Sequence, residues 1–320
     1  MMLFNRVLAA LGMLACAAGI ASAQTFPSRP ITLYLPFIPG ATDTMARKFT
    51  EIAAKNLGQP IVVENKPGAG GTLGPALMAR SAAPDGHTLS VIPSSLFRYP
   101  YMQKVDWDPI RDFTYVTGLT TDAMSMEVAA ASPFRSFEDV VRWARANPGR
   151  LSYGTPGAGT SMHLLTETAA AQLGLQLLHV PYKGGSDVMR ALLGGEIMVA
   201  VDTAGTFFTQ VAAGKARYLV QFGEKRAAWM ADVPTAREVG LDFVYTVAVG
   251  IAGPRGLPEP VVNRLHEAFS KAFEDPETLR VLEVLKKDPW PMTPAAYTAW
   301  AKESYRQERA MVERAGMMAK

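Results

Sequence analysis

Residues 31–57 read ITLYLPFIPGATDTMARKFTEIAAKNL, and this stretch carries the pattern on which the fold rests. Its first five residues form a strand-like run that is mostly apolar. From residue 43 onward, apolar side chains recur at helical spacing, at Ala46, Phe49, Ile52, Ala53 and Leu57. A turn that contains Gly40 lies between the two. We therefore expect a strand, a glycine-bearing turn and a helix over 43–57, which together begin a βαβ unit.

Two further glycine-bearing segments, ENKPGAGG at 64–71 and YGTPGAGTS at 153–161, also lie between strand-like runs and helical patterns. The second of them leads into a helix that begins near Thr160. At a helix start the first N–H groups have no partner within the helix and the helix dipole is positive, so a carboxylate or phosphate that docks there satisfies both. Most glycine-rich turns of this kind bind nothing, so each segment taken alone is better explained as a plain turn.

Strand-like runs and helical patterns alternate along the rest of the chain. The first series has strands at 31–35, 61–64 and 88–92 and helices at 43–57 and 73–82. The second series follows the turn at 131–133, with helices at 136–146, 160–173, 186–193 and 207–213 and strands at 151–153, 177–180, 197–201 and 218–222. After a strand at 244–251, helices are expected at 258–273, 276–285 and 294–316. Such alternation indicates two α/β lobes, each built on a mainly parallel sheet.

The N-terminus has the pattern of a secretory signal. Arg6 precedes an apolar run at 7–20, and the small residues Ala21, Ser22 and Ala23 follow it. The run is shorter than the roughly 20 residues that a membrane span requires. We therefore predict a signal peptide over 1–23 and a periplasmic mature chain.

The composition excludes several kinds of partner and chemistry. The chain has a formal net charge of +3 and no basic stripe interleaved with aromatic residues, which argues against a nucleic-acid partner. Its single cysteine, Cys16, lies inside the predicted signal, so the mature chain has no disulfide and no thiolate nucleophile. Lipid attachment at Cys16 is the alternative, although residues 13–15 fit such a site poorly. We expect no metal, because four histidines lack the close spacing of a zinc helix: His87, His163, His179 and His266. We also expect no cofactor, because the sequence has no dinucleotide fingerprint.

Enzyme motifs are missing from the sequence. It has no Gly-x-Ser-x-Gly elbow and no P-loop, and the glycines at 154, 157 and 159 do not follow the order of a dinucleotide fingerprint. A binding protein is therefore favoured over an exported enzyme. A periplasmic ligand sensor that signals to a membrane sensor kinase stays open as the alternative.

In their chain order, ten short segments resemble the substrate-binding proteins of tripartite tricarboxylate transporters, the Bug family. They are FPSRPI (26–31), PFIPGATD (36–43), ENKPGAGG (64–71), PDGHTL (84–89), DF (112–113), SYGTPGAGTSMH (152–163), HVPYKGG (179–185), GGE (194–196), VPT (233–235) and EVGL (238–241). Each segment alone is a weak signal, but their order and spacing over almost the whole mature chain are specific to the family.

The resemblance implies a type II periplasmic binding protein, an α/β fold of two lobes joined by two crossover strands that closes on its ligand by a hinge motion. We expect crossovers near 126–130 and 246–251, lobe 1 from 24–126 and 247–320, and lobe 2 from 127–246. The implied function is capture of a small organic carboxylate, either a di- or tricarboxylate, an aromatic carboxylate or an acidic amino acid. A monomeric protein would deliver it to the membrane permease of a tripartite tricarboxylate transporter.

In the family, the loop after the first strand grips a ligand carboxylate, partly through ordered waters. Here that loop supplies Phe37, Pro39, Gly40, Ala41, Thr42 and Asp43. Gly40 lets the backbone approach closely, and Thr42 or Asp43 caps the helix. Relatives usually carry a second glycine where this chain has Ala41, at which a positive φ would be disfavoured.

A second group of candidates, Ser94, Ser95 and Arg98, follows the strand at 88–92. The guanidinium of Arg98 is available there for a second ligand carboxylate. The alternative is a solvated Arg98 with Tyr99 in the core.

Lobe 2 would bind the far end of the ligand with backbone amides and hydroxyls. The candidates are Tyr153, Gly157, Ala158, Gly159, Thr160, Ser161 and His163. His163 faces either the cleft or the core, and a neutral imidazole is expected beside the positive end of a helix. Tyr182, Asp202 and Thr203 follow strands, where ligands bind open α/β sheets. Asp202 either answers the ammonium group of an amino-acid ligand, binds through water or caps the next helix.

Overall fold

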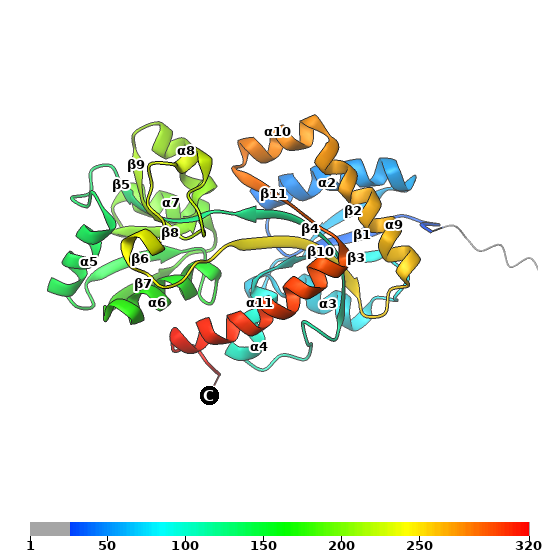
Figure 1. Ribbon diagram of the computed structural model, residues 1–320, viewed down its shortest axis with the longest axis horizontal. Coiled ribbons are helices and arrows are strands. Elements are labelled where there is room, and N and C mark those ends of the chain that lie inside the picture. Colours follow the sequence, from blue (N-terminus) through cyan, green and yellow to red (C-terminus); the bar gives the residue numbers. More distant parts are fainter. Residues whose placement is uncertain (1–25, 320) are drawn as a thin grey trace, which may run out of the picture.

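The computed structural model describes residues 26–319, so the predicted signal peptide lies outside the described residues. Figure 1 shows two lobes side by side along the longest axis, each built on its own sheet. Between residues 26 and 319, no helix is both long enough and apolar enough to cross a membrane.

The first lobe contains a six-stranded mixed sheet in the order β11-β4-β10-β3-β1-β2. Its strands are β1 (Ile31–Leu35), β2 (Ile61–Asn65), β3 (Thr88–Pro93), β4 (Phe113–Asp122), β10 (Val247–Pro254) and β11 (Lys287–Met292). β1 runs parallel to β2 and β3, whereas β10 runs antiparallel to β3 and β4, and β11 antiparallel to β4. The expectation of a mainly parallel sheet is therefore wrong for the half of this sheet that comes from β4, β10 and β11.

Helices cover both faces of this sheet and enclose its core. They are α2 (Ala41–Leu57), η1 (Ala69–Gly71), α3 (Leu73–Ser81), α4 (Ser95–Met102), α9 (Glu259–Ser270), η4 (Lys271–Glu274), α10 (Pro276–Val284) and α11 (Pro294–Arg314). Alternate residues of β1 point to one buried face, where Leu33 packs in the same cluster as Phe49 of α2 and Leu265 of α9. The strand and helix periods visible in 31–57 thus converge on one apolar core.

The second lobe contains a five-stranded mixed sheet in the order β7-β6-β8-β5-β9. Its strands are β5 (Met124–Ala129), β6 (Leu151–Thr155), β7 (Leu177–Pro181), β8 (Val199–Thr203) and β9 (Ala216–Gln221), and its helices are α5 (Phe137–Ala146), α6 (Ser161–Leu173), α7 (Gly185–Gly194), α8 (Ala204–Ala212), η2 (Ala228–Met230) and η3 (Arg237–Val239). β6 runs parallel to β7 and β8, and β5 runs antiparallel to β8 and β9.

The chain passes twice between the two sheets. It leaves the first sheet at the end of β4 and enters the second at β5, and it returns where Tyr245, bonded to Phe222 of the second lobe, precedes β10. The helix α11 then packs against both α4 of the first lobe and α6 of the second, as the red helix in Figure 1 shows. The lobe boundaries at 126/127 and 246/247 stay a prediction.

Besides the short helix η1, three elements of the first lobe were not expected from the sequence: α4, β4 and β11. β11 contains Pro289 and Pro291, which lack the N–H that a central strand needs. The sheet order places β11 at an edge, where one side of the strand forms no ladder and proline is tolerated. The helices expected from 258 onward are otherwise present, although the first of them is divided into α9 and η4.

Candidate functional site

Three loops of the first lobe meet at the C-terminal ends of β1, β2 and β3. A Cβ atom placed on Gly71 would lie 3.3 Å from the ring of Phe37 and 3.5 Å from Oγ of Ser95. The loop before α2, the loop after β2 and the start of α4 are therefore in contact with one another. This is the edge of an α/β sheet at which ligands bind.

The loop before α2 ends in a helix start with free amides. Gly40 is the N-cap residue and no side chain caps the helix, so the expectation that Thr42 or Asp43 caps it is wrong. Ala41 is already helical and has a negative φ, so no strain arises from the missing second glycine. Within residues 26–319, the amides of Ala41, Thr42 and Asp43 donate to no protein group. They are available to an anion.

Asp43 stabilises this loop instead of capping the helix. Its carboxylate accepts hydrogen bonds from Arg47 Nε at 2.8 Å and Asn65 Nδ2 at 2.9 Å. The hydrogen bond from Arg47 lowers the pKa of Asp43, so the carboxylate is charged and compensated. Asn65 also donates to the carbonyl of Phe37 at 2.8 Å. The end of β2 thus fixes both ends of the loop.

Ser94 and Ser95 at the start of α4 are both buried but differ in their partners. The hydroxyl of Ser94 lies 3.3 Å from both the N–H and the carbonyl oxygen of Ala248 in β10. Oγ of Ser95, in contrast, has no hydrogen-bond partner in the part of the chain that the structure describes. Because a buried hydroxyl without a partner is costly, Ser95 is the better candidate for a ligand contact.

In the second lobe, the loop before α6 has a backbone that glycine alone adopts readily. Gly157 has φ 128° and Gly159 has φ 71°, both in the left-handed half of the Ramachandran map. Thr160 is the N-cap, and its hydroxyl accepts from the amide of His163. Ala158, Thr160 and Ser161 leave their amides unpaired within residues 26–319. The second helix start therefore offers donors as the first one does.

The amide of Gly159 is the exception, because it donates to Nδ1 of His163 at 3.0 Å. His163 stacks on His179, with ring centroids 3.8 Å apart and an interplanar angle of 12°. Burial lowers the pKa of each histidine to about 4. The expectation of a neutral, hydrogen-bonding His163 is confirmed, and its ring packs within lobe 2. Tyr153 lies in the same core with its hydroxyl bonded to Glu167, which leaves it no free donor.

Asp202, at the end of β8, is nearly completely buried. Its Oδ1 accepts from the amide of Thr203 at 2.6 Å, while Oδ2 has no partner within 26–319. Burial raises the pKa of Asp202 to about 7. The next helix, α8, has no side-chain cap, so the capping alternative for Asp202 is wrong. Tyr182, after β7, is half-buried and packs over Gly154.

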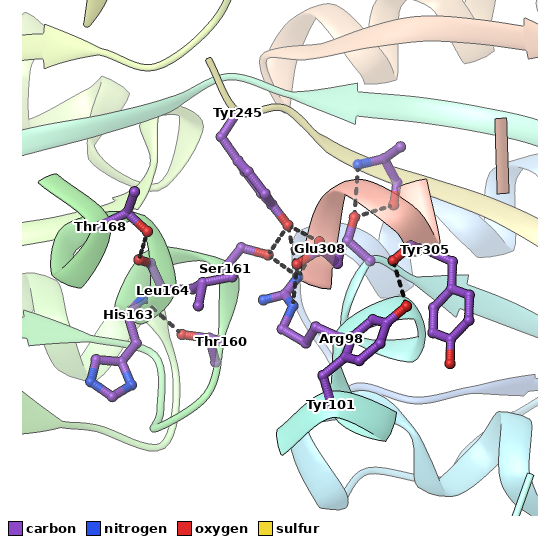
Figure 2. Close-up of polar contacts among 12 residues, drawn as sticks. Arg98, Tyr101, Thr160, Ser161, His163, Leu164, Thr168, Tyr245, Tyr305 and Glu308 are labelled. Carbon is purple, nitrogen blue, oxygen red and sulfur yellow. Dashed lines mark hydrogen bonds and ion pairs between the residues drawn. The ribbon is translucent and has the colours of Figure 1, made fainter. Parts of the chain in front are cut away.

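Arg98 lies in a buried polar network that joins the two lobes, shown in Figure 2. Its Nη2 donates to Ser161 Oγ at 2.7 Å and to Tyr245 Oη at 2.8 Å. Nε of Arg98 lies 3.2 Å from Oε2 of Glu308 in α11, and the Tyr245 hydroxyl donates to Glu308 as well. Arg98 is fully buried, so the alternative of a solvated Arg98 is wrong.

The charges in this network compensate one another. Burial works against the charge on Arg98, but Glu308 and Tyr245 together raise its pKa, so the guanidinium stays protonated. Burial raises the pKa of Glu308, and Arg98 and Tyr245 oppose that rise. An ion pair is the assignment that the 3.2 Å contact supports, because arginine does not give up its proton in proteins. Glu308 and Tyr245 lie far from Arg98 in the sequence, and no motif points to them.

Within residues 26–319, no group of three or more His, Cys, Asp or Glu side chains is placed to hold a metal ion. The candidate site thus consists of two helix starts with free amides, one buried hydroxyl without a partner and an internally compensated arginine.

Known proteins are similar to this chain in both sequence and fold. The profile of the tripartite tricarboxylate transporter family receptor matches residues 45–317. A Cupriavidus necator protein, named the UPF0065 protein in gbd 5'region, is 41% identical over 310 residues, which cover 97% of this chain and 94% of that protein.

Two similar solved structures contain carboxylates. MatC from Rhodopseudomonas palustris, solved with bound malate, is 30% identical with a TM-score of 0.80 and covers 90% of this chain and 100% of its own. Another R. palustris protein, solved with adipate, is 25% identical with a TM-score of 0.83. The match covers 91% of this chain and 98% of that protein. The predicted fold, a periplasmic binding protein of two α/β lobes, is confirmed by such neighbours.

Proposed function

The chain belongs to the tripartite tricarboxylate transporter receptor family, and on that premise we propose that it captures a small organic carboxylate in the periplasm for delivery to a membrane permease. Family and fold are those of substrate-binding proteins and not of enzymes. The predicted signal peptide supports a periplasmic location, and we propose a monomer as the binding species.

The single observation that carries this proposal is the pair of helix starts with free amides, one in each lobe. A Cβ atom on Gly159 of lobe 2 would lie 3.2 Å from Met102 and 3.8 Å from the Tyr99 hydroxyl, both in lobe 1. The loop before α6 therefore lies beside α4, and the first residue of α4, Ser95, lies near Phe37 of the loop before α2. A carboxylate between them would meet N–H donors and the positive ends of two helix dipoles.

This chemistry favours an anion without requiring a free cationic side chain. Hydrogen bonds from fixed N–H groups to a carboxylate are charge-assisted and gain strength where water is excluded. Oγ of Ser95 would supply a further donor from lobe 1. The malate and adipate found in two relatives are of the same chemical class.

Delivery follows from closure of the two lobes around the ligand. The passages from β4 to β5 and into β10 join the sheets, and a bend there would separate the loop before α2 from the loop before α6. A ligand that contacts both loops would favour the closed form, because it binds that form more tightly. The permease would then recognise the closed form.

A thermal-shift screen of residues 24–320 tests this function. The panel contains hexanoate, adipate, malate, citrate, benzoate and glutamate, with glycerol as an uncharged control. A ligand at about 100 times its Kd stabilises the native state by about 2.7 kcal/mol, which is a shift of several degrees. We expect a saturable shift with at least one carboxylate and none with glycerol. No shift with any carboxylate, for protein refolded free of ligand, would contradict the proposal.

A further inference from the structure

Glu308 occupies a position that a ligand carboxylate would otherwise be expected to take. Arg98 follows β3 in α4, at the same sheet edge as Ser95 and the loop before α2, where an arginine is suited to an incoming carboxylate. In the structure the carboxylate beside Arg98 belongs to α11 of the same chain, with Nε of Arg98 3.2 Å from Oε2 of Glu308 (Figure 2).

The network reaches the start of α6, where lobe 2 offers its free amides. Nη2 of Arg98 donates to Oγ of Ser161, the first residue of that helix, at 2.7 Å. Tyr245 and Ser161 carry no charge, and the charges of Arg98 and Glu308 cancel, so the net charge of the network is zero. Within 26–319, Nη1 of Arg98 has no partner, so the guanidinium keeps an unused donor.

Stability alone gives little reason for an ion pair here. Replacing a buried pair by apolar side chains of similar volume is often neutral or stabilising, because both charges lose their hydration. What a buried pair provides, and an apolar pair does not, is a fixed charge balance next to the start of α6.

We propose that Glu308 is a specificity-determining residue that cancels the charge of Arg98 and restricts the site to carboxylates without a second negative charge at the lobe 2 end. The inference rests on the proposed function, since it assumes that a carboxylate binds between the two helix starts. Glu308 acts through Arg98 and does not itself touch the ligand.

The test compares Glu308→Gln with the unchanged protein in calorimetric titrations with hexanoate and adipate, two six-carbon ligands that differ by one carboxylate. The substitution keeps the side-chain volume and an acceptor for Tyr245 but leaves Arg98 uncompensated. The unchanged protein should bind adipate no more than about threefold more tightly than hexanoate, and the substitution should raise that preference by at least about tenfold. Tyr245→Phe, which removes a hydrogen bond from the same network without changing charge, should leave the preference unchanged.

A purely structural role for Glu308 would weaken both ligands equally and leave the adipate preference of Glu308→Gln where it was; that result would overturn the inference. If Glu308→Gln does not fold, the double variant Arg98→Met/Glu308→Met decides. The inference requires the double variant to prefer adipate over hexanoate by the same factor as the unchanged protein. A selective loss of adipate binding by about tenfold or more would identify Arg98 as a direct carboxylate ligand and overturn the inference. If the unchanged protein bound neither hexanoate, adipate nor any other panel carboxylate, the proposed function would fail instead.

Discussion

The loop before α2 and the loop before α6 look alike in sequence but hold their helix starts in different ways. Both contain Pro-Gly-Ala between a strand and a helix. Gly40 has φ 169°, an extended backbone that any residue adopts, whereas Gly157 and Gly159 have φ 128° and 71°. Only the loop before α6 needs its glycines for their conformation.

The two loops also differ in what holds them in place. The loop before α2 depends on Asn65 at the end of β2, a residue outside the loop. The loop before α6 is held by residues next to it in the chain, through Thr160 and His163 at the start of the helix and Thr155 at the end of β6. A glycine motif therefore indicates where a loop lies, but the backbone conformation and the stabilising contacts decide which residue matters.

The largest effect is expected from Gly159→Val, which breaks the loop before α6. Valine at φ 71° is strained by about 1–2 kcal/mol, and its Cβ would lie 3.2 Å from Met102. We expect the Kd for the tightest carboxylate of the panel to rise at least tenfold, about 1.4 kcal/mol. Calorimetric titration and chemical denaturation measure the two effects.

Gly149→Val is the matched control for this strain. Gly149 has nearly the same φ, 72°, in the turn between α5 and β6, and nothing lies within 4 Å of its added Cβ. It should lose a similar stability and keep the ligand affinity. Equal affinities for both variants would mean that the loop before α6 does not contact the ligand.

A smaller effect is expected from Asn65→Ala, which removes the external support of the loop before α2. The substitution deletes hydrogen bonds to Phe37 and Asp43, for a loss of about 1–2 kcal/mol in unfolding free energy. We expect the Kd to rise about threefold, because the free amides remain but are less well positioned. Asn56→Ala, in the last turn of α2, removes one exposed hydrogen bond and should change neither quantity measurably. A larger effect on affinity from Asn56→Ala than from Asn65→Ala would refute this role.

The sequence was sufficient for the α/β alternation and for the position of both helix starts, because strand and helix periods are local signals. α2 and α6 begin within two residues of where the patterns indicated. The antiparallel strands were harder, since β10 and β11 join the first sheet from the far end of the chain and β11 carries two prolines.

Partners of single side chains could not be predicted for a related reason. Arg98 and Glu308 are separated by 210 positions, and nothing local in α11 distinguishes Glu308 from the exposed glutamates of an amphipathic helix. Asp43 resembled a cap because caps are the commonest role of aspartate near a helix start, yet Arg47 and Asn65 hold it elsewhere.

As the pH falls, the stability contribution from the loop before α6 should be lost at a higher pH than the contribution from the loop before α2. Burial lowers the folded-state pKa of His163 to about 4 from its ordinary 6.5, so the unfolded chain takes up the proton first. The stability that comes from keeping His163 neutral is complete above about pH 6.5 and is lost progressively between pH 6.5 and pH 4. The pKa of Asp43 is lowered, so its contribution is lost only as pH falls below its ordinary 3.8.

Chemical denaturation from pH 7 to 4.5 checks this difference. His163→Asn keeps an acceptor for the Gly159 amide but does not titrate, so its stability should fall less steeply than that of the unchanged protein. Asp43→Asn should be less stable but run parallel to the unchanged protein over this range. A parallel curve for His163→Asn would exclude His163 as a source of acid sensitivity.

The smallest effect is expected from Gly40→Ala, and it separates the two loops most directly. The backbone at Gly40 is extended, and an added Cβ would meet only the Ile38 carbonyl at 3.9 Å. The unfolding free energy should rise by about 0.4–1 kcal/mol, because alanine restricts the unfolded chain without straining this conformation. If the first helix start binds the carboxylate through its amides or through water, the Kd should change less than about twofold. A tenfold loss of affinity in a fully stable Gly40→Ala would mean that the ligand itself fills the space of that methyl group. Gly40 would then be required for close approach of the ligand, whereas Gly159 is required for its backbone conformation. Substitution of either glycine would weaken binding by a similar factor.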